Sequence, residues 1–248
     1  MAEILALIPA RGGSKSIPRK NLLPLAGRPL IVHSIEQARA SRLVSRVIVT
    51  TDDAEIAAVA KAAGAEVPFL RPAELARDDS LDIEFHRHAL DWLGAQERYR
   101  PDAVVNLRPT NPTRRPATID RAIETFLAHP EADSLRSVSL AEQTPYKMWL
   151  IGADGCLAPV AALPGTTEPY NLPRQRLPLV YWQNGYVDIA WTRTVMEKQS
   201  TTGTRILPFV IEERSVDIDY PDEVADAERA IAEGDAEANG SAGKRHPS

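Results

Sequence analysis

A cluster of cations and glycines near the amino terminus has the composition of an anion-binding loop. Its cations are Arg11, Lys15, Arg19 and Lys20, and its glycines are Gly12 and Gly13. Glycine lets backbone N–H groups approach an anion closely, and cations neutralise the charge of that anion. Because unpaired like charges this close repel one another, the cluster favours a loop that binds phosphate. An ordinary strand-to-helix turn with solvated charges is the alternative.

A pair of carboxylates near the other end of the chain has the composition of a metal site. Asp217 and Asp219 flank Ile218, so along a strand the two acids would point one way and Ile218 the other. Two such carboxylates repel unless a cation lies between them. Mg²⁺ binds through one or two carboxylates together with substrate phosphates. The alternative is a charged strand end that caps a helix at about 223–232.

The composition is that of a globular enzyme-sized chain. Its 248 residues are 44% hydrophobic and 25% charged, which fits one domain with an excursion. The net charge of −5 argues against nucleic acid as a partner. The sequence shows no apolar run long enough to span a bilayer and no signal-peptide pattern, so we expect no membrane contact and a cytoplasmic location. The single Cys156 excludes an internal disulfide framework.

Strands alternate with helices as far as Thr144. Strands are expected at 4–9, 44–51, 65–69, 103–107 and 134–139, and helices from Leu30 and at 54–63, 81–93 and 119–127. Asp52 or Asp53 would cap the helix at 54–63, with ligand contact as the alternative. The alternation predicts an α/β fold with a mostly parallel sheet. Ligands of such sheets lie beyond the carboxyl ends of the strands.

Two later stretches depart from this alternation. The turn 108–114 holds Pro109 and Pro112 and cannot continue the strand before it. From Pro145 to Gly203 the chain is rich in proline, aromatic and hydroxyl residues. We therefore predict one domain over 1–232, with an excursion at about 145–203 that covers the carboxyl edge of the sheet. Small and charged residues predominate over 233–248, which predicts a disordered tail.

These motifs together resemble the acylneuraminate cytidylyltransferases, the CMP-sialic acid synthetases. The matching runs are Pro9–Lys15, Pro18–Asn21, Arg71–Leu75, the turn 108–114 and Asp217–Asp219. The turn is similar to the family segment Leu-Gln-Pro-Thr-Ser-Pro-Leu-Arg, with Arg108 in place of the glutamine, and Ser16 replaces a usual glycine. The resemblance implies a three-layer, Rossmann-like nucleotidyltransferase fold of the GT-A-like kind. It also implies a homodimer whose contact lies in the small inserted segment.

The resemblance further implies cytidylyl transfer from CTP to a small acidic acceptor, with Mg²⁺ on Asp217 and Asp219 and release of pyrophosphate. Arg11 and Lys20 would join the two acids in catalysis by steadying the leaving pyrophosphate. The implied nucleotide-binding residues are Ala10, Arg11, Gly12, Gly13, Ser14, Lys20, Asn21 and Arg71. The implied acceptor-binding residues are Arg108, Thr110, Lys147, Arg174 and Asn184.

Three readings of the function stay open at this point. The first is transfer to a sialic-acid-like nonulosonic acid. The second keeps the chemistry with another acid, such as a phosphonate or a different keto-sugar acid, because a fixed cation at Arg108 favours an acceptor with an anionic group facing it. The third is a non-catalytic nucleotide-binding module, against which the acidic pair argues. No residue type or spacing identifies a general base.

Overall fold

The chain forms two compact units. A computed structural model describes the backbone of residues 2–242 and the side chains of residues 2–234. The larger unit is formed by Met1–Ser137 and Asn184–Ser248, and the smaller by Val138–Gln183. The smaller unit overlaps the expected excursion, but the chain returns to the larger unit at Asn184 because the strand β9 (Tyr181–Trp191) extends into the main sheet.

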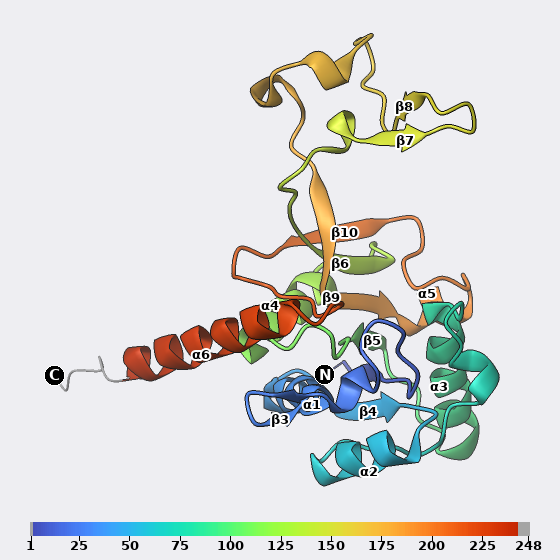
Figure 1. Ribbon diagram of the computed structural model, residues 1–248. Coiled ribbons are helices and arrows are strands. Elements are labelled where there is room, and N and C mark those ends of the chain that lie inside the picture. The colour runs from blue at the N-terminus through green and yellow to red at the C-terminus, as the bar shows by residue number, and fades with distance from the viewer. Residues whose placement is uncertain (1, 243–248) are drawn as a thin grey trace, which may run out of the picture. The chain divides into compact units, whose positions relative to one another are not determined.

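A six-stranded sheet with the order β10-β6-β9-β5-β1-β4 is the centre of the larger unit (Figure 1). Its other strands are β1 (Ile4–Pro9), β4 (Arg46–Thr50), β5 (Ala103–Asn106), β6 (Ser134–Leu140) and β10 (Ile206–Val210). β1 runs parallel to both β4 and β5, whereas β9 is antiparallel to β5. The expected α/β fold with a mostly parallel sheet is confirmed.

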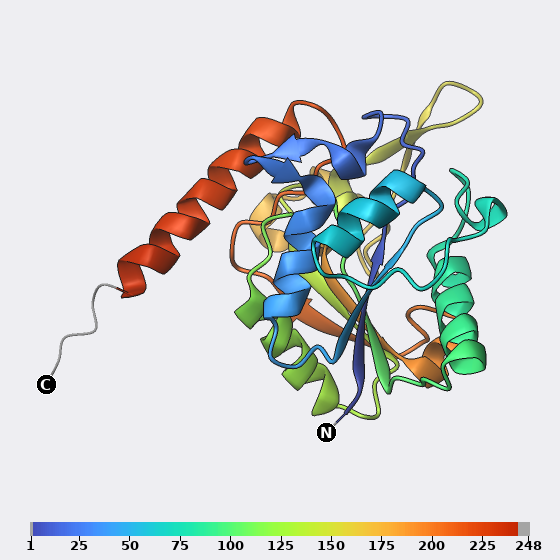
Figure 2. The same cartoon turned by 90° about the horizontal axis from the view of Figure 1, so that it is seen from below.

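Helices cover both faces of this sheet (Figures 1 and 2). One face is covered by α1 (Leu30–Ala40), α2 (Ala54–Ala62) and α4 (Pro116–Leu127), and the other by α3 (Asp82–Gln96) and α5 (Thr192–Met196). Helix α6 (Glu223–Ala242) lies outside these layers (Figures 1 and 2). Because side chains alternate along a strand, Ala6 and Ile8 of β1 pack with α1, α2 and α4. Leu5 and Leu7 of β1 pack with α3 and α5 on the other face. The result is a three-layer arrangement.

Short hairpins complete the two units. In the larger unit, β2 (Pro24–Leu25) pairs with β3 (Arg28–Pro29) just before α1. In the smaller unit, β7 (Trp149–Ile151) pairs with β8 (Leu157–Pro159). No helix within residues 2–242 is long and apolar enough to cross a membrane.

Three expected elements differ from the structure. The segment 65–69 pairs only at Glu66, through a single bridge to Ile48, because Pro68 has no N–H to extend a ladder. The segment 215–219 is not a strand; Ile218 is buried as expected, but its N–H donates to the carbonyl oxygen of Thr110 at 2.7 Å. Helix α6 continues past 232 to Ala242, and the last part of the expected tail, 243–248, lies outside the described residues.

The turn after β5 is held in place by one buried cation, Arg114. Its side chain is almost wholly buried. The guanidinium donates to the Ser34 hydroxyl and to the backbone carbonyl oxygens of Arg108, Asn111, Gly185 and Tyr186. Burial lowers the pKa of Arg114 to about 10, so the group stays charged at neutral pH. Arg114 thereby fixes the turn to both α1 and β9.

We expect Arg114→Met to destabilise the protein by about 3–5 kcal/mol, because several buried carbonyl oxygens would lose their donor. Urea denaturation followed by circular dichroism measures this change. Arg121→Met is the matched control, because Arg121 lies on the exposed face of α4. A loss of stability no larger than that of the control would contradict the role of Arg114.

Candidate functional site

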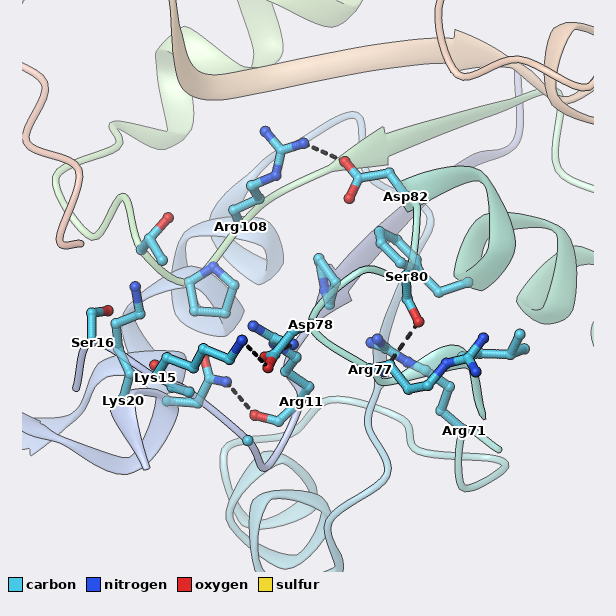
Figure 3. Close-up of a pocket in the computed structure, with 18 of the residues that line it drawn as sticks. Arg11, Lys15, Ser16, Lys20, Arg71, Arg77, Asp78, Ser80, Asp82 and Arg108 are labelled. Carbon is cyan, nitrogen blue, oxygen red and sulfur yellow. Dashed lines mark hydrogen bonds and ion pairs between the residues drawn. The ribbon is translucent and has the colours of Figure 1, made fainter. Parts of the chain in front are cut away.

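A pocket of about 430 Å³ lies beyond the carboxyl end of β1, between the loops that follow β1 and β5 and the segment 71–82 that leads into α3 (Figure 3). Six of the expected nucleotide-binding residues line it, namely Arg11, Gly13, Ser14, Lys20, Asn21 and Arg71. Ala10 and Gly12 do not line it. The N–H of Ala10 donates to the carbonyl oxygen of Thr50 at 3.0 Å, and the N–H of Gly12 donates to the Asp52 carboxylate at 2.9 Å. These two residues anchor the loop.

Glycine is required at position 12 by the packing of the loop on α2. A Cβ atom there would lie 2.8 Å from Oδ2 of Asp53. The other carboxylate oxygen of Asp53 accepts hydrogen bonds from the N–H groups of Glu55 and Ile56, so the expected capping role of Asp53 is confirmed. These hydrogen bonds, led by that of Ile56, lower the pKa of Asp53. Asp52 and Asp53, which precede α2, thus fix the position of Gly12 in the loop.

Two cations of the loop converge on a carboxylate that the sequence did not single out. Asp78 lies 2.7 Å from Nη1 of Arg11 and 2.8 Å from Nζ of Lys15, as Figure 3 shows. Lys15 and Arg11 hold the pKa of Asp78 below its ordinary value. Arg19, another cation of the loop, pairs instead with Asp53 and Glu55. The pocket therefore takes its positive charge on this side from Arg11 and Lys15.

Lys20 joins the amino-terminal loop to the carboxyl-terminal acidic segment. Its Nζ donates to Oδ1 of Asp219 and to the carbonyl oxygen of Ile218, both at 2.9 Å. The Lys20 side chain is only 12% exposed, whereas that of Asp219 is 60% exposed. Residues almost two hundred positions apart therefore meet at one wall of the pocket.

Asp217 and Asp219 provide the only expected metal ligands, and the donor set fits a hard cation. Oδ1 of Asp217 is buried and has no hydrogen-bond partner among the described residues, and burial raises the pKa of this carboxyl. Among residues 2–234, no group of three or more His, Cys, Asp or Glu side chains is arranged to hold a metal ion. An ion here would take its remaining ligands from phosphate oxygens or water.

Arg71 forms the back of the pocket. Its side chain is 6% exposed, and it donates to the hydroxyl and carbonyl oxygens of Thr50 at 3.1 and 2.5 Å. The guanidinium carbon lies 5.0 Å from the centre of the Phe85 ring. Burial lowers the pKa of Arg71 to about 10, so it is a fixed cation whose position is set by β4 and α3.

The expected acceptor residues fall into three groups. Arg108 and Thr110 line the pocket, and the Thr110 side chain hydrogen-bonds to the carboxylate of Asp217. Asn184 is buried, and its Oδ1 accepts from the Ser137 hydroxyl at 2.7 Å. Lys147 and Arg174 belong to the smaller unit, where they donate to the backbone of Tyr170 and Glu142 respectively.

Arg108 already has two carboxylate partners. It contacts Asp82 at the start of α3, as Figure 3 shows, and lies 3.5 Å from Asp188 of β9. Burial opposes its charge, but these two carboxylates raise the pKa of Arg108 above its ordinary value. The sequence did not single out Asp78, Asp82 or Asp188. The one available signal was charge balance, since buried cations need anions beside them.

Comparison with known proteins gives one consistent family. Residues 5–147 match the family model described as Cytidylyltransferase. The CMP-N,N'-diacetyllegionaminic acid synthase of Legionella pneumophila is 34% identical over 227 residues, which cover 88% of this chain and 92% of that protein. The pseudaminic acid cytidylyltransferase of Campylobacter jejuni is 39% identical over 123 residues, which cover 50% of this chain and 53% of that protein.

The fold also matches a solved structure. A CMP:2-keto-3-deoxy-manno-octonic acid synthetase complexed with CTP aligns with a TM-score of 0.67 over 94% of this chain and 100% of that one. Its sequence identity is 18%, so the match shows the fold.

We expect Asp78→Asn to bind inorganic pyrophosphate several-fold more tightly than the wild type, because Asp78 competes with an anion for Arg11 and Lys15. Isothermal titration calorimetry measures the affinity. The matched control is Asp79→Asn, whose exposed side chain lies 3.8 Å from Arg77. Equal gains in both variants would indicate general charge repulsion, and unchanged or weaker binding in Asp78→Asn would contradict the competition.

Proposed function

The chain belongs to the cytidylyltransferase family, and we propose that it transfers the cytidylyl group of CTP to a sialic-acid-like nonulosonic acid. Family membership makes it a CTP-dependent nucleotidyltransferase. The observation that carries the proposal is the contact between Lys20 and Asp219, which joins the cationic loop to the acidic segment at the pocket. Asp219 lines this pocket, and Asp217 lies behind it, with Thr110 of the pocket wall as its hydrogen-bond partner. The names of the relatives, which are synthases of CMP-activated sugar acids, support the class of acceptor.

The triphosphate of CTP would lie along the loop after β1. Arg11, Lys15 and Lys20 supply positive charge there, and the carboxylate of Asp78 would give way to phosphate. An oxygen of the acceptor attacks the α-phosphorus in line, and pyrophosphate leaves. Because negative charge spreads over the phosphoryl oxygens, the residues contribute mainly by positioning and by electrostatic stabilisation. Arg11 and Lys20 would steady the pyrophosphate as it leaves.

Asp217 and Asp219 would hold Mg²⁺. Oδ1 of Asp217, which has no hydrogen-bond partner among residues 2–234, and the exposed carboxylate of Asp219 beside the phosphate loop offer two hard oxygen ligands. When bound, the ion supplies Lewis-acid stabilisation of the charge on the phosphate oxygens.

The acceptor would approach over Gly185, where the chain has no side chain. A Cβ atom at this position would lie 3.7 Å from Oδ2 of Asp217 and 3.9 Å from Nη1 of Arg108. The cyclic form of a 2-keto acid carries its attacking hydroxyl and its carboxylate on one carbon. Such an acceptor can present the hydroxyl toward Asp217 while its carboxylate faces Arg108. Thr110, Asn184, Lys147 and Arg174 stay in the proposal as further acceptor residues, and other acids with an anionic group stay as the second candidate class.

The smaller unit supports a homodimer. Large apolar side chains of its hairpin are exposed, with Leu150 at 61%, Ile151 at 78% and Leu157 at 60%. A second copy of this chain is the occupant that we propose, because the hairpin is apolar on a chain that is otherwise rich in charge. A copy of the same unit would bury both hairpins at once.

The function is tested by measuring pyrophosphate release from CTP and Mg²⁺ with a panel of acids. The panel holds N-acetylneuraminic, N,N'-diacetyllegionaminic, pseudaminic and 3-deoxy-manno-octulosonic acids and a phosphonate. We expect release with CTP and at least one of the three nonulosonic acids, and none when ATP, GTP or UTP replaces CTP. Absence of release with every acid would refute the proposed transfer.

Asp217→Asn is the matching variant for the metal site. We expect it to abolish release in Mg²⁺, because it removes one of two anionic ligands, while its circular dichroism spectrum stays that of the wild type. Release close to the wild-type rate would refute the role of Asp217 as a metal ligand.

We expect static light scattering to give twice the 27.2 kDa mass of one chain for the wild type. Ile151→Asp should shift the mass toward that of a single chain, because it would place a charge in the buried interface. Glu142→Ala in the same unit, at an exposed residue, is the control. A wild-type mass of one chain would contradict the dimer.

A further inference from the structure

The face of the sheet beneath α3 changes from apolar to charged toward Arg108, which lines the pocket. Val104 of β5 and Ala190 of β9 are opposite each other and belong to the apolar cluster under α3. Two residues further along, Asn106 is opposite Asp188. Because alternate residues of a strand share a face, Asp188 lies on the α3 side. A sheet face that packs on a helix is normally apolar, so a charge here needs another explanation.

A neighbouring strand continues this charged row. Leu135 of β6 belongs to the apolar cluster on the opposite face, so the next residue, Arg136, faces the same side as Asp188. Nε of Arg136 lies 3.2 Å from Oδ1 of Asp188, and Nη1 of Arg108 lies 3.5 Å from Oδ2. One carboxylate therefore bridges two guanidinium groups, with one oxygen toward each.

The two arginine side chains of this row are more exposed than the carboxylate between them, which favours the binding of an anionic ligand. The Asp188 side chain is 12% exposed, whereas those of Arg136 and Arg108 are 25% and 30% exposed. Burial raises the pKa of Asp188, and the two arginines oppose that shift. The Asp188 carboxylate is thus shielded by the two cations. Asp82, the other partner of Arg108, is 39% exposed, so an acid that binds Arg108 would displace Asp82, while Asp188 would stay in place.

We propose that Arg136 is a second acceptor-binding cation beside Arg108, and that Asp188 is a positioning residue that holds both guanidinium groups. This inference rests on the proposed function and specifies its acceptor as an acid with two anionic or strongly hydrogen-bonding groups. Planar guanidinium groups bind such groups through directional, charge-assisted hydrogen bonds. A buried carboxylate that fixes both planes reduces the ordering needed when the acid binds.

Steady-state kinetics with the acid of the panel that the wild type uses best provide the test. We expect Arg136→Gln and Asp188→Asn each to raise the KM of the acid about tenfold, the effect of losing one charge-assisted contact. The KM of CTP should stay within about twofold. Arg136→Lys should give an intermediate KM for the acid, because it keeps the charge but loses the planar fork.

Arg46→Gln is the matched control. Arg46 of β4 also lies between two carboxylates, at 2.5 Å from Glu66 and 2.6 Å from Glu97. Neither of these carboxylates pairs with a pocket residue, whereas Asp188 links Arg136 to Arg108, which lines the pocket. We expect this control to lower the unfolding temperature and leave the KM of the acid unchanged. If Arg136→Gln fails to fold, Arg136→Lys alone decides, since an unchanged KM of the acid in that variant would overturn the proposal.

The outcomes separate this inference from the proposed function. A wild type that turns over no acid removes the proposed function and this inference with it. A wild type that turns over an acid, with an unchanged KM of that acid in Arg136→Gln, overturns the inference alone. A parallel rise in the KM values of acid and CTP also overturns it, because that result would show a general disturbance of the fold.

Discussion

The site depends on a buried guanidinium that backbone carbonyl oxygens satisfy. Pro109 and Pro112 fix part of the turn after β5, but prolines have no N–H to donate, and the N–H of Asn111 makes a single long bond to the carbonyl oxygen of Arg108 at 3.3 Å. Arg114 adds the remaining hydrogen bonds by donating to carbonyl oxygens of the turn and of β9. The positions of Arg108 and Gly185, between which the acceptor is proposed to lie, are thereby set by one side chain.

Four cations of the pocket, namely Arg11, Lys15, Lys20 and Arg108, are each paired with a carboxylate of the same chain. Asp78 pairs with Arg11 and Lys15, Asp219 with Lys20, and Asp82 and Asp188 with Arg108. These carboxylates reduce the repulsion between the crowded cations that the sequence implied, so the cations do not destabilise the fold. A ligand must compete with these carboxylates, and this competition favours the multiply charged triphosphate over anions of lower charge.

Local patterns predicted those parts of the fold that local chemistry decides. The strands β1, β4 and β5 and the capping of α2 by Asp53 follow from apolar runs and short-range hydrogen bonds. Asp188 and Arg136 escaped notice because each is a single charge within a strand, and its partner lies on another strand. The strand expected at 215–219 was wrong for a related reason, since alternation reports which side chain is buried and not whether a neighbouring backbone is free to pair.

The two acids that the sequence treats as a pair are physically unequal. Asp217 is largely desolvated, and its Oδ1 has no hydrogen-bond partner among the described residues. A metal ion that binds this carboxylate would therefore displace little water from it. Asp219 is exposed and bound to Lys20, so a cation that binds it competes with Nζ of Lys20. In the proposed reaction, Nζ of Lys20 would turn from Asp219 toward the phosphates, which would leave the Asp219 carboxylate open to a cation. Metal binding and phosphate binding would then reinforce each other. Lys20, which binds phosphate, and Asp219, which binds the cation, hold each other until their ligands are present.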